Sequence, residues 1–141
     1  MDLLKQENVQ IYEKDTDWEE AIRISVKPLE DGGYVTPAYK EEIIANVNNL
    51  GPYIVLTEDI ALPHARPEQG VLESQLAVTL FKKPVAFNED YPATRLFVAL
   101  AAGDGEKHLN ALASLMELFQ DEARVEAMLK AEDRESLFRY F

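Results

Sequence analysis

The chain contains no cysteine among its 141 residues, and it has only two histidines. Without cysteine there is no disulfide, no thiolate metal site and no cysteine nucleophile. Basic residues are also few: 14 lysines and arginines stand against 26 acidic residues, which gives a formal net charge of −12. Nucleic acid and anionic membrane surfaces both repel such a chain, so we expect no nucleic-acid partner and no membrane binding.

Long hydrophobic runs are absent too, and no stretch approaches the roughly 18 apolar residues that a membrane-spanning helix needs. The first residues show neither the basic start nor the apolar core of a signal peptide, so we expect a soluble cytoplasmic protein. Several catalytic motifs are also missing: the G-x-S-x-G elbow, the phosphate-binding P-loop, the dinucleotide fingerprint, the H-E-x-x-H zinc motif and the EF-hand loop.

Apolar residues make up 47% of the sequence, enough for one compact domain over residues 1–141. Two hydrophobic periods alternate along the chain and predict an α/β layered sandwich around a mixed, mainly parallel sheet. Strands are expected over residues 9–12, 53–56, 75–81 and 95–102. Helices are expected from a Thr16–Glu19 capping box to Gly32 and Gly33, kinked or shortened by Pro28, and from Thr36 to about Leu50. A third helix should open at residues 103–105, with shorter ones from Asp121 and Asp133.

His64 stands out because a proline precedes it directly and a second proline follows three residues later. Such a segment suits neither a helix nor a central strand, so we expect a stiff loop. Arg66 lies two residues on, close enough to bind the same anion. A stiff loop that carries an imidazole and a guanidinium is suited to positioned chemistry on an anionic group.

His108 falls near the start of the third long helix, which Asp104 or Gly105 should cap. Backbone N–H groups and the positive end of the helix dipole gather there and favour a bound phosphate.

The residues alone leave alternatives open: either histidine could be an ordinary surface residue, and Arg66 an ordinary loop charge. A metal site built on the two histidines is possible, but the case for it is weak because no carboxylate stands at a spacing that would complete the ligand set. Tyr53 is interpreted as part of the core.

Residues 60–65 read I-A-L-P-H-A, and this motif resembles the enzyme IIA domains of the bacterial phosphoenolpyruvate-dependent sugar phosphotransferase system, of the mannitol/fructose type. The longer stretches over residues 51–56 and 60–71 are similar to the ascorbate branch of that superfamily. Residues 83–88 and the helix with His108 match in order and spacing, so the resemblance covers nearly the whole chain.

The resemblance implies a phosphocarrier. His64 matches the histidine that takes a phosphoryl group from the phosphocarrier protein HPr and passes it to an enzyme IIB, with the membrane component IIC engaged only indirectly. His108 matches the second histidine at the pocket. The step needs no metal, nucleotide or other cofactor, and the family fold is an α/β sandwich with helices on both sides of a mainly parallel sheet. The transported sugar would be ascorbate-like.

The sequence departs from the family pattern at residues 46–49, N-V-N-N, where the mannitol and fructose branches carry an arginine that pairs with the phosphoryl group. Either Arg66 takes that electrostatic role, or backbone amides and His108 stabilise the phosphoryl group without it. One alternative keeps the fold but makes the chain a regulatory module, whose phosphorylation at His64 controls a transcriptional or other target. A plain binding domain with an incidental Pro-His pair is the least favoured interpretation.

Overall fold

The computed structural model describes residues 3–141 and arranges them as helices around one sheet. The strands are β1 (Leu4–Tyr12), β2 (Val55–Thr57), β3 (Asp59–Ala61), β4 (Gln75–Val85) and β5 (Thr94–Ala101). The helices are α1 (Trp18–Asp31), α2 (Ala38–Leu50), α3 (Gly105–Phe119), α4 (Glu122–Leu129) and α5 (Arg134–Phe138), with a 3₁₀ turn, η1 (Pro67–Gln69), between β3 and β4.

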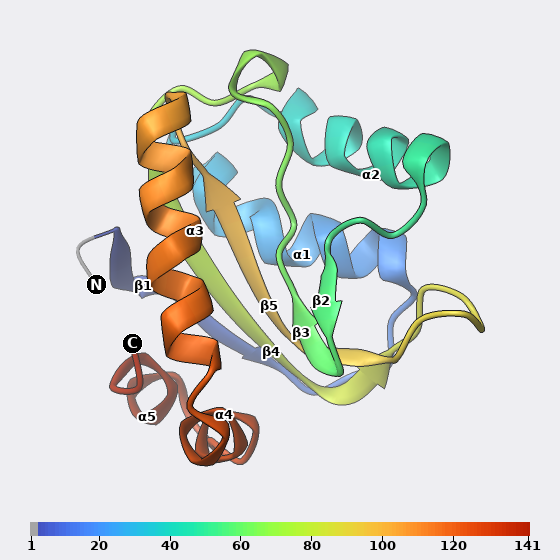
Figure 1. The fold of residues 1–141 in the computed structure, drawn as a ribbon, viewed down its shortest axis with the longest axis vertical. Coiled ribbons are helices and arrows are strands. Elements are labelled where there is room, and N and C mark those ends of the chain that lie inside the picture. The colour runs from blue at the N-terminus through green and yellow to red at the C-terminus, as the bar shows by residue number, and fades with distance from the viewer. Residues whose placement is uncertain (1–2) are drawn as a thin grey trace.

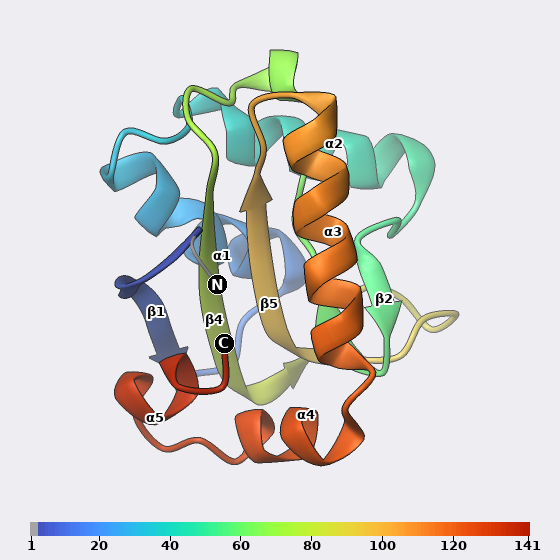
Figure 2. The same cartoon turned by 60° about the vertical axis from the view of Figure 1, so that its left-hand side comes forward.

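The sheet has the strand order β1-β4-β5-β3-β2. The pairs β1–β4 and β3–β5 are parallel, whereas β4–β5 and β2–β3 are antiparallel. Helices α1 and α2 cover one face of the sheet and α3 crosses the other, with α4 and α5 at one end of the molecule (Figures 1 and 2). The predicted layered α/β fold with a mixed sheet is therefore confirmed.

The central strands are apolar along their length because both of their faces are covered. In β4, Ala77 and Phe81 join a buried cluster with α1 and α2. Leu76, Val78 and Leu80 of the same strand join a second cluster with α3, α4 and α5. Successive side chains point to opposite faces of a strand, so a strand between two helical layers needs apolar residues at every position.

Helix α1 ends at the predicted glycine, with Gly32 as its C-cap, but it differs from the prediction at its N-cap and at Pro28. Its N-cap is Asp17 rather than Thr16, because the Asp17 carboxylate accepts a hydrogen bond from the backbone N–H of Glu20. Pro28 does not shorten the helix, which continues to Asp31. The carbonyl of Ile24, which Pro28 cannot reach for lack of an N–H, instead accepts a hydrogen bond of 2.9 Å from the Gln10 side chain on β1.

The strands differ from the prediction in length and number. The expected strand over residues 53–56 begins only at Val55, and residues 59–61 form the additional strand β3. The strand expected over residues 75–81 continues through Lys82 and Lys83 as far as Val85. The Lys82 ammonium donates a hydrogen bond of 2.7 Å to the carbonyl of Ala131, between α4 and α5. This bond joins the end of β4 to the C-terminal helices.

Candidate functional site

The two histidines meet at one edge of the sheet. Strands β3 and β5 are parallel neighbours, so their carboxyl ends lie side by side, and in open α/β sheets such an edge is where ligands bind. His64 follows β3, and the helix that carries His108 follows β5. The two imidazole rings lie with their centroids 5.6 Å apart, at 58° to each other.

Backbone hydrogen bonds from distant parts of the chain hold the segment around His64. The backbone N–H of Leu100 on β5 donates to the carbonyl of Pro63 at 2.9 Å. The hydroxyl of Tyr53 donates to the carbonyl of His64 itself. The predicted loop is thus present, and contacts with other elements add to the stiffness that the two prolines confer.

The imidazole of His64 has a defined orientation. Its Nδ1 atom lies 2.6 Å from the carbonyl oxygen of Leu62. Because a carbonyl oxygen only accepts hydrogen bonds, this contact places the proton of the neutral ring on Nδ1. The lone pair therefore resides on Nε2, which is the nitrogen available to react.

A cavity of about 340 Å³ opens beside the two histidines. It is lined by Tyr53, His64, Ala65, Arg66, Pro67, Gly105 and His108. His64 is half-buried in its wall, and burial lowers the pKa of the imidazole below 6.5, with the nearby charge of His108 acting in the same direction. The hydrogen bond to Leu62 opposes this shift. His64 is accordingly neutral at pH 7 and keeps its Nε2 lone pair.

His108 lies in the first turn of α3, as predicted, and the helix has the expected cap. The Asp104 carboxylate accepts a hydrogen bond of 2.7 Å from the backbone N–H of Lys107. Gly105 and His108 both line the cavity, so the positive end of the helix dipole faces the site. The arrangement favours negative charge beside Nε2 of His64.

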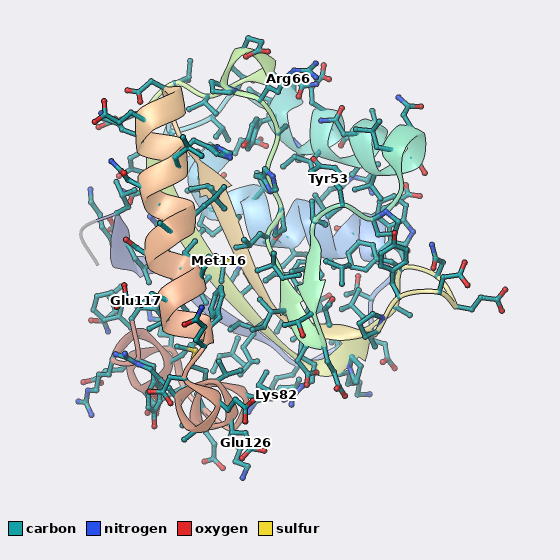
Figure 3. All side chains as sticks on the ribbon, in the orientation of Figure 1. Tyr53, Arg66, Lys82, Met116, Glu117 and Glu126 are labelled. Atoms are coloured by element: carbon teal, nitrogen blue, oxygen red, sulfur yellow. The ribbon has the colours of Figure 1, made fainter. Side chains whose placement is uncertain are left out.

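Arg66 lies on the cavity rim, but its side chain points outward near η1 (Figure 3). The side chain is 69% exposed, and its Nε atom lies 3.0 Å from a carboxylate oxygen of Glu68. An exposed ion pair of this kind is weak, so Glu68 competes only modestly with another anion for the guanidinium.

Two neighbours of His64 were not predicted as site residues. Tyr53, assigned to the core, packs against the core cluster and also forms a wall of the cavity, with its ring centroid 5.2 Å from that of His64 in an edge-on contact. Gln69 was also missed: its side-chain oxygen accepts from the backbone of Arg66 at 3.1 Å and from Asn46 at 3.0 Å. Asn46 lies in the segment 46–49, which contains no arginine, and through this hydrogen bond it links α2 to the loop after His64.

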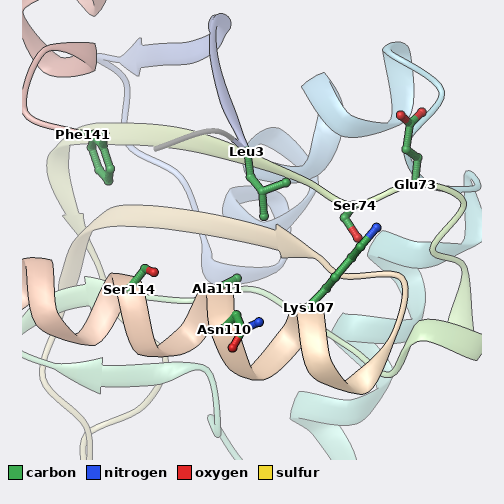
Figure 4. A pocket seen from close by; sticks show the side chains of 8 residues that line it. All are labelled: Leu3, Glu73, Ser74, Lys107, Asn110, Ala111, Ser114 and Phe141. Carbon is green, nitrogen blue, oxygen red and sulfur yellow. The ribbon is translucent and has the colours of Figure 1, made fainter.

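A larger cavity, of about 750 Å³, lies against a different face of α3 (Figure 4). Lys107, Asn110, Ala111 and Ser114 contribute to it from the helix, opposite Leu3 and Phe141 at the two ends of the described chain. On a helix, positions 107, 110, 111 and 114 lie on the side away from 105 and 108. This cavity contains neither histidine, so size alone does not identify the reactive site.

Within residues 3–141, no group of three or more His, Asp or Glu side chains is placed to hold a metal ion. Over the same residues, no helix is both long enough and apolar enough to cross a membrane.

The family of the chain follows from its sequence. The family model "Phosphoenolpyruvate-dependent sugar phosphotransferase system, EIIA 2" matches residues 2–141. The chain belongs to this family, whose members are phosphotransferase-type proteins of sugar phosphotransferase systems. The resemblance stated from residues 60–65 is therefore confirmed.

Individual relatives carry two different sugar names. A mannitol-specific cryptic phosphotransferase enzyme IIA component of Escherichia coli K12 is 32% identical, over 96% of this chain and 92% of its own length. An ascorbate-specific EIIA component of Mycoplasma pneumoniae is 33% identical, over 96% of this chain and 87% of its own.

Solved structures agree with the fold. The solution structure of the mannitol-specific cryptic enzyme IIA CmtB from Escherichia coli matches with a TM-score of 0.89 and 32% identity, covering 99% of this chain and 95% of that one. Enzyme IIA mannitol of Escherichia coli, in its complex with phosphorylated enzyme IIB mannitol, matches with a TM-score of 0.84 and 27% identity, covering 98% and 97%.

Proposed function

We propose that this chain is a single-domain cytoplasmic phosphocarrier that accepts a phosphoryl group from phosphorylated HPr on His64 and passes it to an enzyme IIB. One observation carries the proposal: the carbonyl of Leu62 holds Nδ1 of His64, which leaves Nε2 as the free nitrogen beside an open cavity and a second histidine. A relay nitrogen needs this combination of a fixed ring, an unprotonated lone pair and access for two proteins in turn.

The transfer step balances without metal or nucleotide. The Nε2 lone pair forms a bond to phosphorus while the bond between phosphorus and the donor breaks, and the donor keeps that electron pair. Nδ1 retains its proton on the Leu62 carbonyl, so the positive charge that develops in the ring is stabilised. Gly105 and His108, in the first turn of α3, line the cavity in which the phosphoryl oxygens would lie, and electrostatic stabilisation of this kind is the main demand of phosphoryl transfer. The second transfer, to IIB, is the same step in reverse.

Family membership and the complex of a related IIA with phosphorylated IIB support IIB as the acceptor. The transported sugar is a finer question, because the ascorbate-named and mannitol-named relatives are equally similar, at 33% and 32% identity. The resemblance of residues 51–56 and 60–71 to the ascorbate branch favours an ascorbate-like substrate for the system. Since IIC lies beyond IIB in the relay, this chain would contact IIC only indirectly.

The experiment incubates the chain with phosphoenolpyruvate, enzyme I and HPr, and locates the added phosphoryl group by mass spectrometry under non-acidic conditions. We expect one phosphoryl group, on His64, that leaves when an ascorbate-type IIB is added and persists with a mannitol-type IIB. Label on another residue would refute the carrier assignment. Stable label on His64 that no IIB removes would instead favour the regulatory alternative.

A further inference from the structure

A buried tyrosine on α2, outside the cavity lining, contacts both halves of the site. Tyr39 is fully buried, with 0% of its surface exposed. Its hydroxyl accepts a hydrogen bond of 3.0 Å from the backbone N–H of Ala65 and donates one of 2.7 Å to the carbonyl of Leu100. The carbonyl of Ala65 lies 3.3 Å from the same hydroxyl. Burial raises the pKa of Tyr39 to about 12, so the hydroxyl keeps the proton that it donates at any physiological pH.

Each of these bonds leads to one of the two histidines. Ala65 directly follows His64, and Leu100 is the penultimate residue of β5, from which the chain turns into α3 and His108. The two segments also bond directly, through the backbone N–H of Leu100 and the carbonyl of Pro63. The Tyr39 hydroxyl is thus the only side-chain group between residues 3 and 141 that hydrogen-bonds to both segments at once.

We propose that Tyr39 is a positioning residue for phosphoryl transfer: its hydroxyl links the His64 loop to the end of β5 and thereby sets the separation of the two imidazoles. The inference rests on the proposed function, and it adds a residue that touches neither the phosphoryl group nor a partner. Without this oxygen, the N–H of Ala65 and the carbonyl of Leu100 would be buried without their partner. Such groups are costly, so the loop moves until water or another group satisfies them.

The first test needs no phosphoryl donor. Nuclear magnetic resonance titration gives the pKa of His64 in the wild type and in Tyr39→Phe, each with and without His108→Ala. In the wild-type background, we expect His108→Ala to raise the pKa of His64, because a nearby like charge is lost. In Tyr39→Phe we expect that change to fall to less than half, since the two rings are no longer held at the same separation. An unchanged response would overturn the proposal.

Tyr12→Phe is the matched control. Tyr12 packs edge-on against Phe81 in the same apolar layer, at the end of the sheet away from the site. It also loses one hydroxyl, and we expect it to leave the response of His64 to His108→Ala intact. A reduced response in both variants would show a general effect of removing a hydroxyl and would refute a specific role for Tyr39.

The second test measures transfer from phosphorylated HPr. We expect Tyr39→Phe to lower kcat about tenfold, with KM for phosphorylated HPr within about twofold of the wild type. Combined with His108→Ala, its effect should be smaller than the product of the two single effects, because both changes disable the same arrangement. Purely multiplicative effects would contradict the proposal. If His64→Ala still accepted label, the proposed carrier function of His64 would be refuted. The titration experiment would still test whether Tyr39 sets the separation of the two histidines.

A third measurement covers the case in which Tyr39→Phe does not fold. Amide hydrogen exchange on the wild-type chain reports directly on the backbone N–H of Ala65. We expect it to exchange as slowly as the amides of β4 and β5, since it donates to a fully buried hydroxyl. Exchange at the rate of an exposed loop amide would show that Tyr39 does not hold the loop, and would overturn the proposal.

Discussion

The two histidines are held in different ways. The segment with His64 hydrogen-bonds to three other parts of the molecule: β5 through Leu100, α2 through Tyr39 and the turn before β2 through Tyr53. The turn before His108 has its own helix cap, Asp104, and one side-chain hydrogen bond from elsewhere in the chain, from the backbone N–H of Gly103 to the hydroxyl of Ser74. The nucleophile is thus fixed by the tertiary structure, whereas the charge-stabilising residue is carried by a helix end. We expect changes at the first to abolish transfer and changes at the second to slow it.

The largest effect is expected from His64→Ala, which removes the reacting nitrogen. Phosphoryl uptake from labelled phosphorylated HPr should fall below detection. The imidazole makes its hydrogen bond within its own loop, to Leu62, so the fold should be retained. Circular dichroism and the thermal midpoint check this. A folded variant that still took up label would break the distinction between the two histidines.

His108→Ala should have the next largest effect. Loss of a group that stabilises transition-state charge slows the reaction by about 10- to 100-fold without preventing it. Single-turnover rates of uptake measure the loss, and label should still reach completion on His64. A loss as complete as that of His64→Ala would show that both residues are essential and that the assigned hierarchy is wrong.

The pH dependence sharpens the comparison. Burial, aided by the charge of His108, lowers the pKa of His64 in the folded state. Nε2 is unprotonated above that pKa, so the uptake rate should be flat from pH 8 down to about 6.5 and fall only below it. His108→Ala should move the fall to higher pH. The ratio of variant to wild-type rates at each pH cancels any pH dependence of the donor, and a ratio that does not change with pH would exclude this coupling.

The lowered pKa of His64 also makes the free energy of unfolding depend on pH. Between the folded pKa and the unfolded value near 6.5, the unfolded chain binds more protons at His64. The contribution of this residue to stability is therefore complete above pH 6.5 and is lost as the pH falls. Urea unfolding of the wild type and of His64→Gln at pH 7 and pH 5 measures the difference.

The smallest effect is expected on the rim of the cavity. Arg66 is exposed and already paired with Glu68. Arg66→Gln should slow uptake about threefold at low salt, and Glu68→Gln, which frees the guanidinium, should speed it about twofold. Both effects should shrink at high ionic strength, because exposed charges are screened. A salt-independent loss in Arg66→Gln would indicate that the side chain turns inward and binds the phosphoryl group directly.

Local signals were enough to predict the reactive loop and the helix beside it. Prolines on both sides of His64 predicted a loop, and Asp104 between two glycines predicted the start of α3. These signals are short-range: ring constraints and side-chain caps act over a few residues. The paired strands β4 and β5 were visible for a different reason, since burial on both faces requires an unbroken apolar run.

The missed features depend on partners far along the chain. Pro28 remains inside α1 because Gln10, on another element, satisfies the carbonyl of Ile24. Tyr53 has the pattern of a core residue, yet its hydroxyl reaches the loop of His64. Tyr39 bonds to residues 26 and 61 positions away. A hydrophobic period predicts that such side chains are buried, but it does not identify which backbone group each hydroxyl meets.

The hydrogen bond of Nδ1 to the Leu62 carbonyl has a consequence for the order in which the donor and acceptor proteins bind. A ring with one usable lone pair can hold one phosphoryl group and face one protein at a time. The donor and the acceptor protein therefore compete for the same nitrogen atom, and an excess of either one inhibits binding of the other. The rate at which phosphoryl groups pass from donor to acceptor then depends on rapid dissociation of each protein complex rather than on tight binding.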